Sequence, residues 1–180
     1  MTDEIMTRVL DLRADLSDAD LSGLDLEGAV LVGRRLERAI LRGAVLDSAL
    51  LRGANLTGAD LTGLTAFGLR LEEAELADAR MDGVRLDYSR LSDAVAPRLH
   101  LRAAVVTGGE WQRIHAPGAD LDAARLERVL LHDADLTGAT LRDAVLTGCS
   151  LIGADLDGAD LTGATLVDCD LTRVRGTWIS

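Results

Sequence analysis

The chain has 180 residues, a length that suits one domain, and 48% of them are hydrophobic, so it can bury a sizeable core. Its 30 acidic residues outnumber its 19 basic ones, which are all arginine, and the net charge of −11 excludes binding to nucleic acid or anionic membranes through charge and favours a basic partner. No apolar run of about 18 residues occurs, which excludes a membrane-spanning helix, and two cysteines supply no disulfide framework.

The first thirteen residues stand outside the pattern that follows. They lack the basic and apolar stretches of a secretory signal peptide, which favours a cytoplasmic protein. They include Ile5, Met6, Val9 and Leu10, enough apolar side chains to cover the open end of a core. We therefore expect residues 1–13 to form an N-terminal cap, either as a short helix or as an irregular lid.

From Ala14 to Arg173 the sequence repeats every five residues without a change of frame. Leucine occupies 26 of the 32 positions from Leu16 to Leu171, alanine occupies 20 of the 32 positions two residues earlier, and glycine occupies 16 of the 32 positions two residues later. Leucines at this spacing step about 140° around an α-helix and alternate between the two faces of a β-strand. Neither element would bury them together, whereas a chain that turns after each unit would.

In such a coil, each leucine and the small residue two positions before it point inward. Glycine falls at the corner, where a positive φ costs it little. The other three positions of every unit, the corner included, face water. The sequence therefore predicts that residues 14–173 form a β-solenoid whose core consists of leucine and small side chains.

Units such as "ADLTG" at 59–63 and "ADLDG" at 154–158 resemble the A-(D/N)-L-x-x signature of the pentapeptide-repeat family. The resemblance covers residues 14–173. It implies an all-β fold, a right-handed quadrilateral parallel β-helix of about eight coils with four five-residue units in each coil. An Ala-Pro pair and a cysteine each recur after twenty residues, which agrees with this coil length. At a coil spacing of about 4.8 Å, the rod would be about 38 Å long.

Residues 95–118 match the repeat weakly, and a loop whose length is a multiple of five could lie there without changing the frame. The volumes of inward residues argue for a continuous coil. Trp111, the largest leucine replacement, follows Gly109, and the small Ala116 follows Ile114. Close-packed interiors require such compensation, whereas an excluded loop would not show it. We therefore expect regular coil, with a loop as the alternative.

Arg34 is the one charged residue at an inward position. Burying a charge without a partner is costly. We expect either a local bulge or a side chain that reaches water near the N-terminal end of the rod. The alternative is a buried pair with a carboxylate, although the sequence offers no obvious partner.

The segment 174–180 follows the last unit and contains Trp178 and Ile179. These side chains can fold back as a C-terminal cap or seal the end of the rod against a second copy of the chain. The resemblance to topoisomerase-protecting family members, which dimerise through this end, favours the homodimer.

No catalytic constellation is present, and we expect a protein that is not an enzyme and needs no cofactor or metal. His100, His115 and His132 fall at outward positions of separate units without the spacing of a metal site. Serine and threonine are frequent, but no histidine is expected to activate one. Cys149 and Cys169 fall inward in adjacent coils, where we expect small core residues, although a disulfide is sterically conceivable.

With twenty residues in each coil, the outward residues fall on four faces. One face has eight acids and three arginines, a net charge of −5, the next two carry −3 each, and the last carries −1. The candidate partner-binding acids of the first face are Asp15, Asp18, Glu37, Glu75, Asp78, Asp135, Asp155 and Asp157. The face of lowest charge carries a candidate apolar patch of Val30, Val32 and Leu50.

The family resemblance implies two functions. Some members resemble duplex DNA in girth and charge, occupy the DNA-binding saddle of bacterial DNA gyrase or topoisomerase IV, and protect the enzyme from quinolones and other inhibitors. Strong acidity and an uninterrupted rod favour this function here. The alternative is a general protein-interaction scaffold that binds through the apolar patch, and the leucine-dominated core is typical of such members. No site motif marks the protecting members, so no functional residue is transferred by position.

Overall fold

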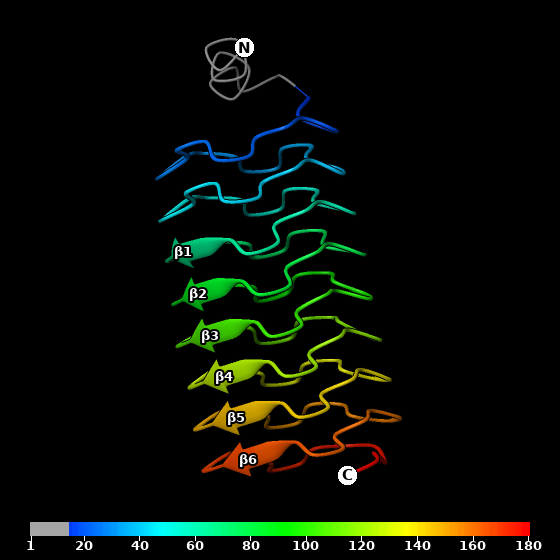
Figure 1. Cartoon of the computed structure of the whole chain (residues 1–180). Helices are drawn as coiled ribbons and strands as arrows, with labels where there is room; N and C mark the ends of the chain where they lie inside the picture. Colours follow the sequence, from blue (N-terminus) through cyan, green and yellow to red (C-terminus); the bar gives the residue numbers. More distant parts are fainter. Residues whose placement is uncertain (1–14) are drawn as a thin grey trace.

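The computed structural model describes residues 15–180, so the predicted N-terminal cap lies outside the described part. Residue 15 and the C-terminus lie at opposite ends of a stack of coils (Figure 1). Parallel bridges join each residue to one twenty positions later, as in Asp20 with Ile40 and Ile40 with Asp60. This register confirms the predicted parallel β-solenoid with four five-residue units in each coil.

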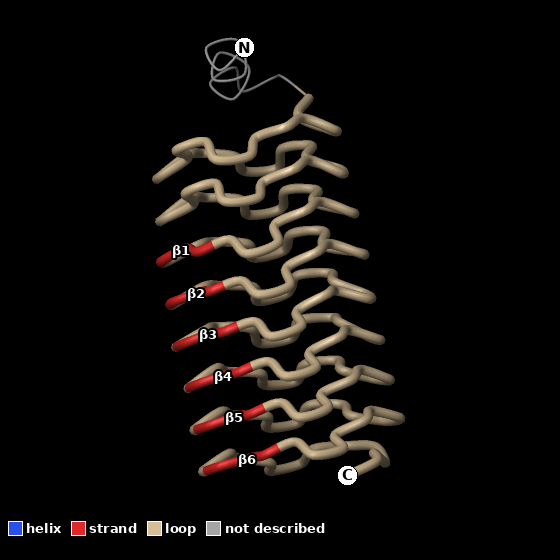
Figure 2. Tube along the Cα trace, viewed as in Figure 1, coloured by secondary structure: helices blue, strands red, loops and turns tan. Residues whose placement is uncertain are grey.

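Six short strands lie one above another and form a single parallel sheet in the order β1-β2-β3-β4-β5-β6 (Figure 2). The strands are Thr65–Phe67 (β1), Arg85–Asp87 (β2), Val105–Thr107 (β3), Arg125–Glu127 (β4), Val145–Thr147 (β5) and Thr165–Val167 (β6). The corresponding units around Leu26 and Leu46 form tight turns instead, in which the leucine carbonyls accept the N–H groups of Ala29 and Ala49. One side of the rod is therefore a sheet, and the other sides are built from turns and isolated bridges.

The corner of every unit has a left-handed backbone. In all 32 units the residue two positions after the inward leucine has a φ between 53° and 73°, and 16 of these residues are glycine. In most units the next residue donates its N–H back to the leucine carbonyl, as from Ala39 to Leu36 at 3.0 Å, which is the pattern of a type II turn. The predicted role of glycine is confirmed, but the fold also holds sixteen other residues in this conformation.

The core follows the predicted frame closely. At the leucine positions, every fifth residue from Leu16 to Leu161 is at most 7% exposed. Of the inward residues two positions before them that the structure describes, only Ala19, Leu24 and Ala29 are partly buried. Residues 95–118 form regular coil as predicted, because Val95 pairs with His115 and the inward alanines of this segment are buried. The core therefore runs without a break through the weakest part of the repeat.

Trp111 shows how the core accommodates a large residue. Its side chain is 1% exposed, and a Cβ atom at Gly109 would lie 2.8 Å from the Trp111 Nε1 atom. The Nε1–H group donates a hydrogen bond of 3.1 Å to the hydroxyl of buried Ser89. The sequence predicted the compensation by Gly109, but it did not predict that Ser89, in the preceding coil, would satisfy the indole nitrogen.

Arg34 does not behave as expected. Its N–H donates to the Leu31 carbonyl at 3.2 Å and the preceding Gly33 has the usual corner φ of 63°, so the predicted bulge is wrong. The residue is only 6% exposed, so the prediction of a side chain that reaches water is also wrong. The backbone ladder on both sides keeps position 34 inward, because turning one residue outward would break its register with the next coil.

Cys149 is buried and Cys169 is half-buried, and both are free thiols. Each Sγ atom lies 3.4 Å from a backbone carbonyl oxygen, that of Leu126 and that of Leu146 respectively. Burial raises the pKa of Cys149 to about 11, so its thiol remains protonated at neutral pH. The pair therefore acts as small core residues, as predicted.

The last residues continue the coil for part of a turn. The Leu161 N–H donates to the Ile179 carbonyl at 2.7 Å, and Ile179 bridges Asp160. Gly176 permits this return, because its φ is 91° and a Cβ atom there would lie 2.3 Å from the Asp157 backbone nitrogen. The segment 174–180 thus covers the backbone edge on two of the four sides of the rod.

Core packing can be tested at Gly109. Gly109→Ala should lower the free energy of unfolding by about 1–3 kcal/mol, because the new methyl group overlaps Trp111. The double variant Gly109→Ala/Trp111→Leu restores the common Ala–Leu pair and should recover most of the loss. The remaining deficit of about 1 kcal/mol reflects the unsatisfied hydroxyl of Ser89. Urea denaturation measures the free energy of unfolding of both variants. A double variant that is no more stable than the single one would contradict the packing argument.

Candidate protein-binding faces

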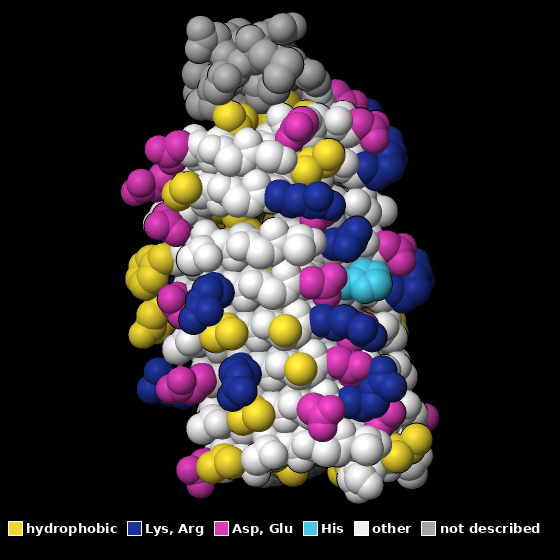
Figure 3. All heavy atoms as spheres, in the orientation of Figure 1, with side chains coloured by type: hydrophobic (Ala, Val, Ile, Leu, Met, Phe, Trp, Pro, Cys, Tyr) yellow, Lys and Arg dark blue, Asp and Glu magenta, His cyan; other side chains and the backbone are white. Residues whose placement is uncertain are grey.

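The rod presents four long faces whose outward residues are stacked in columns. The acidic face comprises the outward residues of the units centred on positions 16, 36, 56, 76, 96, 116, 136 and 156. The strand face carries β1 to β6, and the weakly charged face comprises the units centred on positions 31 to 171 at intervals of twenty. On the side of the rod that Figure 3 shows, acidic and basic side chains stand beside one another rather than in separate patches.

The eight predicted acids lie on one face, but most of them pair with a cation. Arg38 donates two hydrogen bonds to Asp18, at 2.7 and 2.6 Å, and Arg98 donates two to Asp78, both at 2.6 Å. In each case the arginine is twenty residues later and reaches back along the rod. These hydrogen bonds hold the pKa of Asp18 and of Asp78 below its usual range.

Two more ion pairs and a contact with a histidine follow the same column. Asp15 lies 2.9 Å from Arg35, and Asp135 lies 2.7 Å from the His115 Nδ1 atom. Asp155 contacts Arg175 at 3.8 Å. Each partner again lies in the neighbouring coil. The face therefore alternates charges along its length.

Glu37 also belongs to this network. It accepts a 2.7 Å hydrogen bond from the Ser17 hydroxyl, which lowers its pKa, and lies 3.3 Å from Arg35. Within residues 15–180, only Glu75 and Asp157 of the eight acids contact no arginine or histidine side chain through an ion pair or hydrogen bond. The register places these acids on one face, but the charge sum did not indicate how many of the carboxylates pair with an arginine of the same face.

Many aspartates also have a local structural role. Asp20 accepts the N–H of Ser22 at 3.0 Å, and Asp160 accepts the N–H of Thr162 at 3.0 Å. The same bond recurs in other units with an acid or amide before the inward leucine, as in Asn55 with Thr57 at 3.0 Å. Part of the acidity therefore serves the turn itself.

The predicted apolar patch is assembled in space. Val30 and Val32 are 53% and 52% exposed, Leu50 is half-buried, and Val30 bridges Leu50. These three side chains lie on the weakly charged face near the N-terminal end of the described chain. Val30 and Leu50 are neighbours in adjacent coils, and Val32 lies in the same unit as Val30.

The C-terminal end is a second apolar surface. Trp178 and Ile179 are 41% and 63% exposed. Trp178 borders a hollow of about 330 Å³ that the inward leucines of the last coil line. The tail covers only two sides of the coil, so core side chains remain accessible. Contact with a second copy stays a prediction.

The strand face holds a feature that the sequence analysis missed. Phe67 and Tyr88, at the edge of β1 and β2, are more than half exposed and their rings contact each other. The five-residue frame puts Phe67 at an outward position, but it does not indicate the pairing with Tyr88. Since the two residues are 21 positions apart, only the observed register brings their rings together.

One histidine contact was not predicted. The His132 Nε2 atom lies 2.8 Å from the Ser150 hydroxyl, although no histidine was expected to activate a serine. The two residues meet because they occupy the same face in adjacent coils. No other group within residues 15–180 forms a hydrogen bond with the His132 ring. The pair alone therefore does not make a catalytic site.

Among residues 15–180, no group of three or more His, Cys, Asp or Glu side chains could hold a metal ion. The same residues include no helix with the length and apolarity that crossing a membrane requires.

The family model for pentapeptide repeats matches the chain in eight copies, over residues 13–33, 35–63, 118–151 and 141–175. This chain belongs to the pentapeptide-repeat family. The resemblance in the sequence predicted this family, and the match includes the first and the last repeat units of the rod.

Solved structures also resemble this pentapeptide-repeat protein. One is HetL from the cyanobacterium Nostoc sp. strain PCC 7120, a pentapeptide-repeat protein involved in heterocyst differentiation regulation. It is 28% identical to this chain, and the match has a TM-score of 0.46 and covers 90% of this chain and 84% of HetL. Full-length QnrB1, a plasmid-mediated fluoroquinolone resistance protein, is 19% identical with a TM-score of 0.34, over 82% of this chain and 91% of QnrB1. No curated protein matches this pentapeptide-repeat chain.

Among the ion pairs that the structure describes within residues 15–180 of this pentapeptide-repeat protein, that of Asp60 has the least exposed carboxylate. Asp60 is 9% exposed, and Arg42 donates to its carboxylate from Nε at 2.8 Å and from a second nitrogen. Burial favours the neutral acid, but the hydrogen bonds from Arg42 and Thr62 outweigh it and lower the pKa of Asp60 to about 2. Because the folded pKa lies below the unfolded value, the pair stabilises the rod above about pH 4 and loses this effect as the pH falls to about 2.

We predict that Asp60→Asn lowers the free energy of unfolding at pH 7 by on the order of 2 kcal/mol, and by much less at pH 2. The matched control is Asp20→Asn, at the same position of an earlier coil, where the carboxylate has no arginine partner within residues 15–180. Urea denaturation at pH 7, 4 and 2 measures the difference. Equal losses for Asp60→Asn at all three pH values would contradict the assignment.

Proposed function

We propose that this rod is a non-catalytic protein that binds the basic DNA-binding groove of a bacterial type II topoisomerase, DNA gyrase or topoisomerase IV. It would occupy the groove as a mimic of duplex DNA and protect the enzyme from inhibitors. The observation that supports this proposal is the excess of acid on every face of the rod. Duplex DNA is likewise negative around its whole circumference.

The charge density sets the strength expected of this mimicry. Duplex DNA carries one charge per about 1.7 Å, so a length of one coil, about 4.8 Å, carries about three. The net charge of −11 spread over the rod amounts to about half of that density. Ion pairs such as Asp18 with Arg38 do not change this net charge, but they turn much of the surface potential into local dipoles. The attraction should therefore be partial and sensitive to salt.

A supercoiling assay with DNA gyrase tests the proposal directly. The protein should inhibit supercoiling or relieve quinolone inhibition at micromolar concentration. Neither effect at that concentration would contradict topoisomerase binding. If two copies join through Trp178 and Ile179, sedimentation equilibrium of the same sample should give twice the chain mass, and a monomeric mass would refute that contact.

Two matched variants locate the interface. Glu75→Arg/Asp157→Arg changes the two acids of the acidic face that have no ion pair within residues 15–180, and Asp133→Arg/Asp170→Arg changes two such acids of the weakly charged face. Both variants change the net charge equally. The first should weaken the gyrase effect several-fold more than the second. Equal weakening would mean that overall charge, not the acidic face, is recognised.

A second candidate function is a protein-interaction scaffold whose target is not a topoisomerase. The exposed patch of Val30, Val32 and Leu50 favours it, because this apolar surface lies on the face of lowest charge. A partner would bind there by burying aliphatic surface rather than by charge.

Leu50→Arg separates the two functions. It should abolish partner binding through the patch while leaving any gyrase effect intact. Leu130→Arg is the control, since Leu130 occupies the same column of the same face, distant from the patch. Pull-down of a purified partner measures binding. Retention of the partner by Leu50→Arg would contradict the scaffold interface.

A further inference from the structure

The only phenylalanine and the only tyrosine of the chain contact each other on its surface. Phe67 is 55% exposed and Tyr88 is 56% exposed. Their ring centroids lie 5.5 Å apart with an angle of 62° between the ring planes, an edge-to-face arrangement. Neither ring fills the core, which is built from leucine and small residues. The pair therefore presents aromatic surface to an external group.

The backbone fixes the position of the Tyr88 ring. Tyr88 occupies a corner with a φ of 56°, and the corner below it in the next coil is Gly108. A Cβ atom at Gly108 would lie 2.9 Å from both Cδ1 and Cε1 of Tyr88. Because Gly108 has no side chain, the ring can lie directly over this part of the backbone. The aromatic surface is thus formed before any partner binds.

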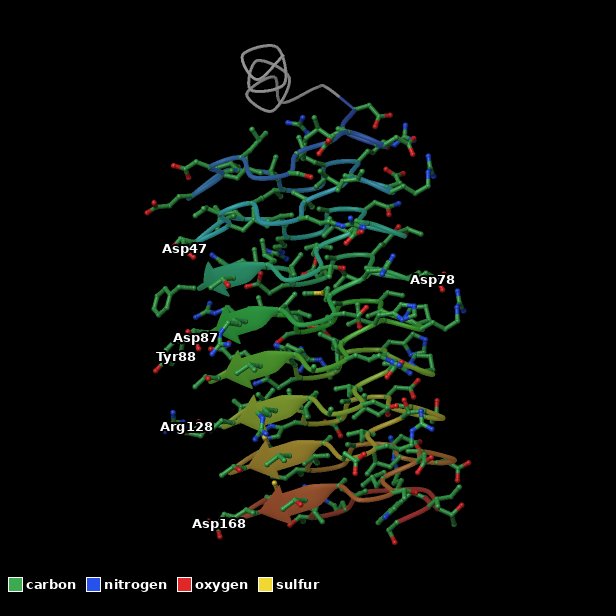
Figure 4. All side chains as sticks on the ribbon, viewed as in Figure 1. Asp47, Asp78, Asp87, Tyr88, Arg128 and Asp168 are labelled. Carbon is green, nitrogen blue, oxygen red and sulfur yellow. The ribbon has the colours of Figure 1, made fainter. Side chains whose placement is uncertain are left out.

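Two carboxylates flank the pair along the same column. Asp87 is the register partner of Phe67 in β2, and Asp47 lies one coil earlier, where its Oδ1 atom accepts the Phe67 N–H at 2.8 Å. Asp47, Asp87 and Tyr88 project from the same edge of the rod (Figure 4). Within residues 15–180, neither carboxylate forms an ion pair, and Arg85, two residues before Asp87 on β2, forms none either. The two carboxylates outnumber Arg85, so the aromatic corner carries a net negative charge.

We propose that Asp47, Phe67, Asp87 and Tyr88 form a binding site for an arginine side chain of a partner protein. The faces of aromatic rings attract cations, and the two carboxylates supply the opposite charge. A guanidinium group is planar and weakly hydrated, so it can stack on a ring while it donates hydrogen bonds to a carboxylate. An ammonium group is more strongly hydrated and cannot do both equally well. The site does not depend on the partner being a topoisomerase.

The composition of the chain permits a direct test. Incorporation of 4-fluorophenylalanine places a single fluorine signal at Phe67, since the chain has no other phenylalanine. Titration with an acetylated and amidated Gly-Arg-Gly peptide should give a saturable shift of that signal. The corresponding lysine peptide should bind about two- to fivefold more weakly. An absent shift, or equal affinity for the two peptides, would overturn the proposal.

Variants test each part of the site. Tyr88→Gly introduces the commonest residue of this corner, so the variant should fold, and it should reduce the affinity for the arginine peptide by about two- to fivefold. Asp47→Asn/Asp87→Asn should weaken binding further, while an asparagine oxygen at position 47 can still accept the Phe67 N–H. The control Asp143→Asn/Asp160→Asn removes the same charge from another face and should leave the shift intact. Wild-type affinity in Tyr88→Gly, or equal losses in the two double variants, would refute the site.

Discussion

The structure depends on one constraint: each five-residue unit must end in a left-handed corner, so that four units return the chain to a point directly above its start. Only this closure brings the N–H groups of one coil to the carbonyl groups of the next, as between Leu36 and Asn55 at 2.8 Å. All 32 corners satisfy it, whether or not they contain glycine. The hydrogen-bond ladder summed over the rod thus outweighs the local cost of a positive φ in residues such as Tyr88 and Arg38.

The same closure organises the surface. Outward side chains stack in columns at about 4.8 Å, so each one meets the residue twenty positions away rather than its neighbours in sequence. A column of acids alone would repel itself, and arginines one coil away relieve this repulsion at Asp18 and Asp78. Glycine has a matching role where a large side chain needs room, as Gly108 does beneath Tyr88. The charge and shape of each face are therefore set by side chains twenty residues apart, which stack in one column, rather than by neighbours in the sequence.

The period of the leucines predicted the fold because it encodes directly which side chains point inward. The volumes of the inward residues then predicted the continuous coil at residues 95–118 and the match of Gly109 with Trp111. The prediction for Arg34 failed, because the hydrogen-bond ladder between coils keeps this side chain inward despite its preference for water. The pairing of His132 with Ser150 and of Phe67 with Tyr88 was also missed. Such contacts depend on how far side chains reach between coils, which a five-residue frame does not specify.

Acidity alone does not distinguish a DNA mimic from a scaffold, because aspartates such as Asp20 also stabilise their own turns. A mimic differs in using its excess of negative charge, which is largest on the acidic face, to attract a basic groove. The measurement that tests this most directly is the affinity of the intact rod for purified gyrase between about 0.1 M and about 1 M salt, a range in which the Debye length falls from about 10 Å to about 3 Å. The account predicts that the affinity falls steeply over this range. Gyrase binding that does not change with salt would contradict it.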